Sequence, residues 1–141
     1  MIPQSCVKIE TTKFPVLDGE EDELVNEGMY GKSLGLYLKD SLPEIGIKTN
    51  GLVCEDWGWW LDVESGSFKM GLCLYCDPDS DGDPKAYAIL PSIQSAEKWS
   101  WKKFGKIDQS QPVVEIMNKI ASLLESDHEI SKVSRHDDFM F

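Results

Sequence analysis

The chain has 141 residues, of which 41% are hydrophobic and 28% are charged, and its 25 acidic and 14 basic residues give a net charge of −11 at pH 7. These proportions are typical of a globular protein, and we expect one domain over residues 1–141. The charge disfavours general nucleic-acid binding, which needs a basic face, and no segment approaches the ~18 apolar residues of a membrane span.

The first predicted strand covers residues 6–14, CVKIETTKF, in which polar and apolar side chains alternate. Acids after Asp18 then predict a helix start, because carboxylates favour the positive end of the helix dipole. This helix should run to about Leu42, before Pro43, with a break near residues 26–28. Its apolar stripe consists of Tyr30, Leu34, Leu38 and Leu42.

Two glycines accompany this stripe, Gly31 within it and Gly35 beside it. Each weakens a helix by ~1 kcal/mol relative to alanine, so each needs a reason to be there. One reason is close packing of the helix on a sheet. The alternative is that a ligand approaches the bare backbone.

Four successive strands are predicted over residues 47–54, 57–64, 68–76 and 85–93, separated by short turns. The resulting β-meander should form the centre of the fold. Its second strand contains most of the motif CEDWGWW, residues 54–60, which holds three of the five tryptophans.

Alternation along this second strand assigns its tryptophans to two faces. Trp57 and Trp59 would share an apolar face with Leu61 and Val63, so core packing is their expected role. Trp60 would stand on the acidic face, where a large aromatic side chain is harder to explain by packing. Together with Glu55 and Asp56, it is therefore a candidate binding residue.

The four cysteines include a C-x-x-C pair, Cys73 and Cys76, inside the third strand of the meander. Positions three apart on a strand point to opposite faces, so this pair neither chelates one metal nor closes a disulfide without a bend. We expect free thiols and no cofactor. The start of the chain shows no apolar run of signal-peptide length, and we predict a cytoplasmic protein.

Residues 77–83, DPDSDGD, match the opening of an EF-hand loop, with acids at alternate positions and glycine at the sixth. The match then fails, because the eighth position is Pro84 and the twelfth is Ala88 instead of glutamate. A hairpin loop rich in turn formers explains the same residues. No metal site is predicted.

Residues 98–106, KWSWKKFGK, carry four of the 14 basic residues, interleaved with three aromatics. Such interleaving can hold a nucleobase or a phosphate by stacking and charge. Alternatively, the segment is a strand whose lysine stems cover tryptophan rings and whose ammonium groups pair with Glu55 or Asp56. The candidate binding residues here are Trp99, Trp101, Lys102 and Lys103.

A second helix should begin at Ser110, with proline in its first turn, and residues 129–135 should form a short edge strand. The apolar stripe of this helix consists of Val113, Ile116, Met117, Ile120 and Leu124. The order β-α-β-β-β-β-α-β predicts an α+β fold of two layers, a mostly antiparallel sheet with two helices on one face. The other face would be open to solvent, a ligand or a partner.

Catalysis is poorly supported, because the only histidines, His128 and His136, lie outside any motif and no phosphate-binding or nucleophile motif is present. Acid–base work by Glu55, Asp56 or Asp62 is the remaining enzymatic alternative. The segments EDELVNEGMYGK, CEDWGWW and KWSWKKF together resemble a family of small uncharacterised bacterial proteins, some carried on mobile gene cassettes. That resemblance implies a bacterial source and no particular activity.

Two functions therefore stay open. The first is an acidic, non-catalytic protein-interaction module of the inhibitor or immunity type, with a basic protein as partner. The second is a binder of nucleotides or other anionic small molecules through the Trp/Lys surface. A homodimer is also predicted, because Trp60, one of Trp99 and Trp101, and the tail 139–141 are apolar groups that a two-layer monomer covers badly.

Overall fold

The computed structural model of the chain describes residues 5–66, 68–77, 82–92 and 110–137. The strands in this part of the chain are β1 (Cys6–Thr11), β2 (Lys48–Cys54), β3 (Trp59–Ser65), β4 (Phe68–Cys76), β5 (Ala86–Ser92) and β6 (Ile130–His136). The helices are α1 (Glu20–Glu23), α2 (Lys32–Ser41), the 3-10 helix η1 (Leu42–Ile45) and α4 (Ser110–Glu125).

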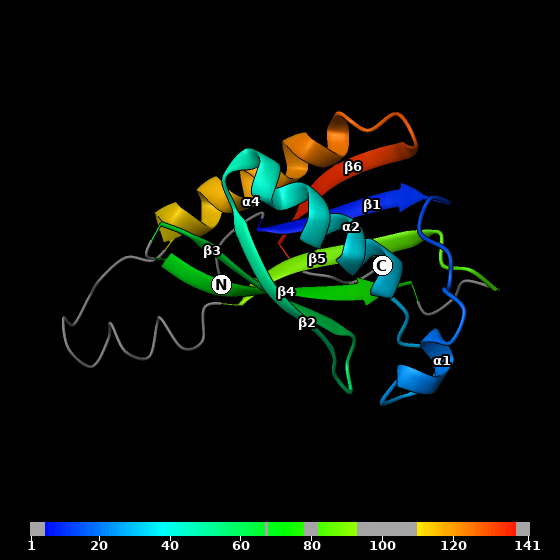
Figure 1. Ribbon diagram of the computed structural model, residues 1–141. Coiled ribbons are helices and arrows are strands. Elements are labelled where there is room, and N and C mark those ends of the chain that lie inside the picture. The colour runs from blue at the N-terminus through cyan, green and yellow to red at the C-terminus, as the bar shows by residue number, and fades with distance from the viewer. Residues whose placement is uncertain (1–4, 67, 78–81, 93–109, 138–141) are drawn as a thin grey trace.

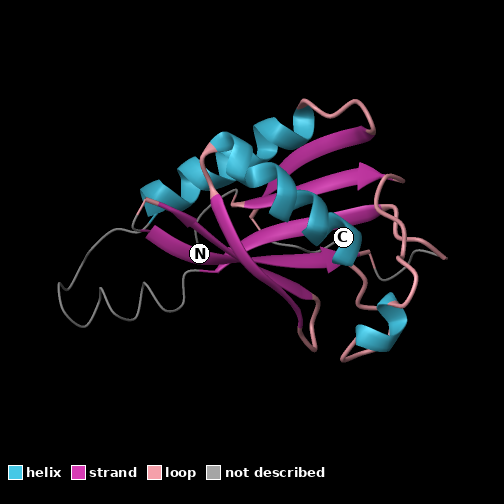
Figure 2. Ribbon diagram, viewed as in Figure 1, coloured by secondary structure: helices cyan, strands magenta, loops and turns pink. Residues whose placement is uncertain are grey.

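The strands form one antiparallel sheet in the order β2-β3-β4-β5-β1-β6. Helices α2 and α4 lie on the same face of this sheet (Figure 1), and the other face carries no helix among the residues described (Figure 2). The predicted α+β architecture with an antiparallel sheet is therefore confirmed, including β6 at an edge. None of the described helices is long and apolar enough to cross a membrane.

The core lies between the two helices and the sheet, as the apolar stripes of the sequence predict. Every member of the predicted α4 stripe is buried, and so are Leu34, Leu38 and Leu42 from the first stripe. From the sheet, β3 contributes Trp59, Leu61 and Val63.

The glycines of α2 allow this helix to lie close to the sheet. A Cβ at Gly35 would fall 2.6 Å from Cδ1 of Leu52, and one at Gly31 would fall 3.0 Å from Cδ1 of Trp59. Side chains of the sheet therefore occupy the space beside both backbones. Close packing is the correct alternative, and a ligand at this position is excluded by the side chains already there.

The helix predicted from Asp18 to Leu42, with a break near residues 26–28, is two separate helices, because residues 24–31 between α1 and α2 are not helical. The buried carboxylate of Glu20 explains how the second helix starts. Its Oε2 accepts hydrogen bonds of 3.0 Å from the backbone N–H groups of both Gly31 and Lys32, and its Oε1 accepts one of 3.1 Å from Leu17 N–H. A side chain eleven residues away thus caps α2, in place of a local capping residue.

A polar cluster joins the segment after β1 to α2 and to the loop between α4 and β6. The ammonium group of Lys13 pairs with the carboxylate of Asp127 and lies 4.7 Å from the ring centroid of Tyr37. The Tyr37 hydroxyl donates to Asp127 Oδ2 at 2.9 Å. Burial, followed by this hydrogen bond, raises the pKa of Tyr37 to about 12, so it stays a donor at neutral pH. We therefore assign this cluster a structural role, because its contacts hold these three parts of the chain together.

Candidate functional site

The face of the sheet opposite α2 and α4, here called the open face, is the candidate site. Cross-strand partners share a face, so the register places the residues opposite Trp60 and Asp62 on it. On the half of the sheet formed by β2, β3 and β4, the open face carries Val53, Trp60, Asp62, Glu64, Lys69, Gly71, Cys73 and Tyr75.

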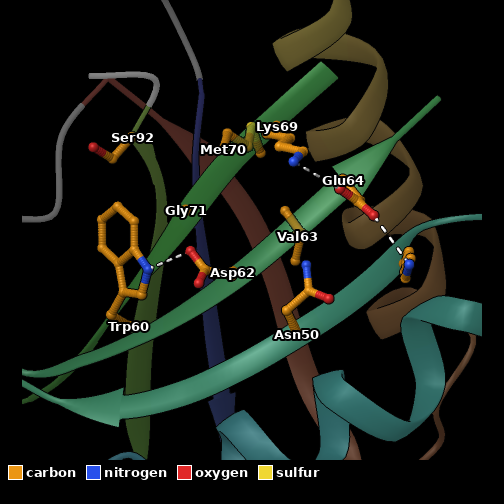
Figure 3. Close-up of a pocket in the computed structure, with 10 residues that line it drawn as sticks. Asn50, Trp60, Asp62, Val63, Glu64, Lys69, Met70, Gly71 and Ser92 are labelled. Carbon is orange, nitrogen blue, oxygen red and sulfur yellow. Dashed lines mark hydrogen bonds and ion pairs between the residues drawn. The ribbon is translucent and has the colours of Figure 1, made fainter. Parts of the chain in front are cut away.

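Trp60 is held in one position on this face by two neighbours. Its ring lies against the backbone of Gly71 in β4, so closely that a Cβ at Gly71 would fall 2.0 Å from Cζ2 of the indole. Its N–H donates a hydrogen bond of 2.7 Å to Oδ1 of Asp62, two residues further along β3. Figure 3 shows the ring beside Gly71 with its nitrogen directed at Asp62. The indole is therefore fixed in orientation while remaining half-buried.

Two further aromatic side chains extend this surface. The ring centroid of Trp57 lies 6.5 Å from that of Trp60, edge to face, and 5.3 Å from that of Tyr75. All three side chains are half-buried. We call Trp57, Trp60 and Tyr75 the aromatic cluster.

The position of Trp57 corrects the sequence prediction that it faces the core beside Trp59. The β2–β3 hairpin closes with a hydrogen bond of 2.7 Å from Glu55 N–H to Gly58 O, which leaves Asp56 and Trp57 as its two loop residues. Alternation of side chains holds only within a strand, and β3 begins at Trp59. The side chain of Trp57 therefore does not follow the core-facing side of β3, and it contacts Trp60 on the open face.

A groove of about 760 Å³ adjoins Trp60 on the open face. The charged side chains along it are largely paired with one another: Glu64 lies 3.4 Å from Lys48 Nζ and 3.9 Å from Lys69 Nζ. The groove is lined by Lys48, Asn50, Trp60, Asp62, Val63, Glu64, Lys69, Met70, Gly71 and Ser92, most of which Figure 3 labels.

A second hollow, of about 400 Å³, lies across β1, β5 and β6. It mixes three lysines with Glu10 and Asp77, and Lys132 Nζ lies 3.7 Å from Glu10. His136 Nε2 lies 2.7 Å from the Ser134 hydroxyl at its border. The mixture of signs gives this hollow no clear ligand preference.

The predicted site residues are only partly brought together. Trp60 lines the groove, whereas Glu55 and Asp56 lie at the hairpin turn and do not. The backbone carbonyl of Asp56 accepts a hydrogen bond of 2.6 Å from Asn26 Nδ2, which ties the turn to the loop before α2. The other candidates, Trp99, Trp101, Lys102 and Lys103, lie outside the described residues, as does most of the DPDSDGD segment.

Nucleophilic or metal chemistry finds no support in the described part of the chain. Cys73 and Cys76 lie on opposite faces of β4, as predicted, and none of the four cysteines forms a disulfide. Burial raises the pKa of the Cys73 thiol to about 11, so it is protonated at neutral pH and a poor nucleophile. Over residues 5–66, 68–77, 82–92 and 110–137, no group of three or more His, Cys, Asp or Glu side chains could hold a metal ion.

Sequence reasoning missed Gly71 and gave Asp62 no binding role. One signal was present: a glycine inside an otherwise regular strand pattern, FKMGLCLYC, commonly marks the close approach of another group. The approaching group is Trp60, but the register that brings it there is visible only in the fold.

Comparison of the chain with protein-family models, curated proteins and solved structures gives no match. A functional proposal therefore rests on the residues of the open face alone. The resemblance to bacterial gene-cassette proteins stays a prediction.

Proposed function

We propose that this chain is a non-catalytic protein-interaction module, of the inhibitor or immunity type, that binds a basic protein partner with its open face. The observation that carries this proposal is the aromatic cluster, three half-buried rings in which Trp57 contacts both Trp60 and Tyr75, on a sheet face that no described helix covers. Tryptophan and tyrosine are the side chains most enriched at the energetic centres of protein interfaces.

The surroundings of the aromatic cluster support a protein surface as the ligand. Val53, the cross-strand neighbour of Trp60, is 50% exposed and extends the apolar area to the edge of the sheet. Paired charges at Glu64, Lys48 and Lys69 form a polar border beside it. An apolar centre with a polar rim is the usual arrangement of a protein interface.

Charge supports a basic partner. The chain carries a net charge of −11, and two acids of the hairpin turn, Glu55 and Asp56, directly precede Trp57 of the aromatic cluster. Complementary charge accelerates association and is weakened by salt. We place the protein in the cytoplasm, where a reducing environment disfavours disulfides, and none of the four cysteines forms one.

The test is affinity capture from a bacterial lysate at low and high salt with three forms of the chain. The wild type should retain a basic partner more strongly at low salt. Trp60→Ala should lose it, whereas Leu36→Ala, at an exposed position of α2 on the helical side, should not. A partner held equally by both variants would place the interface elsewhere, and capture of no partner at either salt would count against the proposal.

The groove supports a second candidate function, the binding of a nucleotide or anionic small molecule beside Trp60. Its volume of about 760 Å³ falls within the range of known ligand sites. Against this, Glu64 already pairs with both lysines of the groove, which reduces its attraction for anions. Tryptophan fluorescence against a panel of nucleotides and anionic metabolites decides the matter, since a flat response across the panel removes this candidate.

A further inference from the structure

We infer that the open face binds an arginine side chain of its partner, with the guanidinium plane stacked on the exposed side of Trp60 and its N–H groups donated to the carboxylate of Asp62. This inference rests on the proposed function, whose partner it specifies. It follows from how Trp60, Gly71 and Asp62 constrain one another.

The first step concerns the ring. With Gly71 against it and its N–H held at 2.7 Å by Asp62, the indole has lost its rotational freedom before any partner arrives. A fixed aromatic plane loses little entropy when a ligand stacks on it. A glycine in a strand interior costs stability, and here it provides the space that this ring position requires.

The second step concerns the carboxylate. Asp62 is exposed, and one oxygen accepts the indole N–H. Among the residues described, no ion pair or further hydrogen bond involves its side chain. The nearby lysines, Lys48 and Lys69, are drawn to Glu64 instead, so a negative charge stands beside the ring without a described cation.

The third step concerns the ligand. An aromatic face beside a carboxylate attracts a cation, and the planar guanidinium fits both at once, because it stacks on rings and donates several N–H groups in its plane. A lysine ammonium is more strongly hydrated and has no plane to stack. The net charge of −11 favours the approach of such a cationic partner.

The test uses defined peptides and the indole N–H signals of the five tryptophans in an ¹⁵N NMR spectrum, with the Trp60 signal assigned by its loss in Trp60→Phe. The probes are acetyl-Gly-Gly-X-Gly-Gly-amide with X as arginine, lysine or citrulline, the last an uncharged analogue of arginine. The arginine peptide should shift the Trp60 signal and bind about fivefold more tightly than the lysine peptide. Citrulline should leave the signal unchanged.

Asp62→Asn is the decisive variant, because asparagine keeps an oxygen for the Trp60 N–H while removing the charge. It should weaken arginine-peptide binding about fivefold or more. Asp40→Asn, an equal charge change at an exposed position of α2, should not. Equal binding of arginine and citrulline, equal effects of the two variants, or no shift at Trp60 would overturn the inference. If the captured partner still depends on Trp60 in any of these cases, the proposed function stands without arginine as its anchor.

Discussion

The indole ring of Trp60 occupies the position where any side chain at Gly71 would begin, with Cζ2, Cη2 and Cε2 within 2.0, 2.2 and 2.5 Å of a Cβ built there. The two residues lie on adjacent strands, and Gly71 is the direct partner of Asp62. Ring, glycine and carboxylate therefore form a single unit. A change that fills the space at Gly71 or removes the hydrogen-bond acceptor at position 62 should therefore move the ring.

Gly71→Ala should displace the Trp60 ring. The new methyl group forces the ring outward, which breaks its hydrogen bond to Asp62 and shifts its indole N–H signal. The free energy of unfolding should change by less than about 1 kcal/mol, because alanine's preference for the strand over glycine offsets the lost contact. Gly51→Ala in β2 is the matched control, since a Cβ there meets no atom within 4 Å. Unchanged Trp60 signals in Gly71→Ala would contradict this reading of the site.

Glu20→Gln should destabilise the fold. The buried carboxylate accepts three backbone hydrogen bonds, whereas the amide turns its NH₂ group toward at least one of those donors. We expect a loss of about 2 kcal/mol in the free energy of unfolding, measured by urea denaturation. Asp22→Asn, an exposed neighbour in α1, should cost almost nothing. Equal stability of the two variants would show that Glu20 does not cap α2.

Asp127 should make stability depend on acid pH. Its hydrogen bond from Lys13, followed by that from Glu129 N–H, lowers the pKa of Asp127 from 3.8 to about 2. A lowered pKa in the folded state adds stability above pH 4, which is lost as the pH falls from about 4 to about 2. The free energy of unfolding of the wild type should therefore exceed that of Asp127→Asn by about 1 kcal/mol at pH 7, a value that allows for solvent screening. This difference should vanish near pH 2.

Denaturation at both pH values measures this difference directly. Glu129→Gln is the control, because Glu129 lies 3.4 Å from the same lysine but is 72% exposed. It should show little difference from wild type at either pH. A difference between wild type and Asp127→Asn that stays constant from pH 7 to pH 2 would exclude the ion pair as its source.

The sequence predicted those parts of the fold that depend on local periodicity. The α4 stripe and the alternation of β3 from Trp59 onward each require only the repeat of one element, and the structure confirms both. Trp57 was assigned to the wrong face because it belongs to the hairpin turn, and the alternation of β3 begins two residues later, at Trp59. A periodicity argument gives no information about where the period begins.

The candidate site depends on contacts between elements, which periodicity does not supply. Trp60 could be singled out because its aromatic side chain falls on a polar face. Its partner Gly71 could not be assigned, since the register between β3 and β4 decides which residue lies under the ring. The cap formed by Glu20 joins residues eleven positions apart across a loop, and it was hidden for the same reason.

Self-association is predicted from the sheet face that no described helix covers and from the two edges of the sheet. The chain mass is 15.9 kDa, and sedimentation equilibrium at high protein concentration should give twice that value. Deletion of residues 139–141, which lie outside the described residues, should weaken the dimer if this tail docks across the interface. A single species of monomer mass over the whole concentration range would exclude the dimer.

Photo-crosslinking inside bacterial cells tests most directly whether the open face binds another protein. A photoreactive amino acid replaces Val53, which is 50% exposed beside Trp60, or Leu36, which is 38% exposed on the helical side. If the open face is the interface, irradiation joins the Val53 form to a discrete basic partner, and the product disappears when Trp60→Ala is added. Crosslinking from Leu36 alone, or equally from both positions, would contradict an interface at the open face.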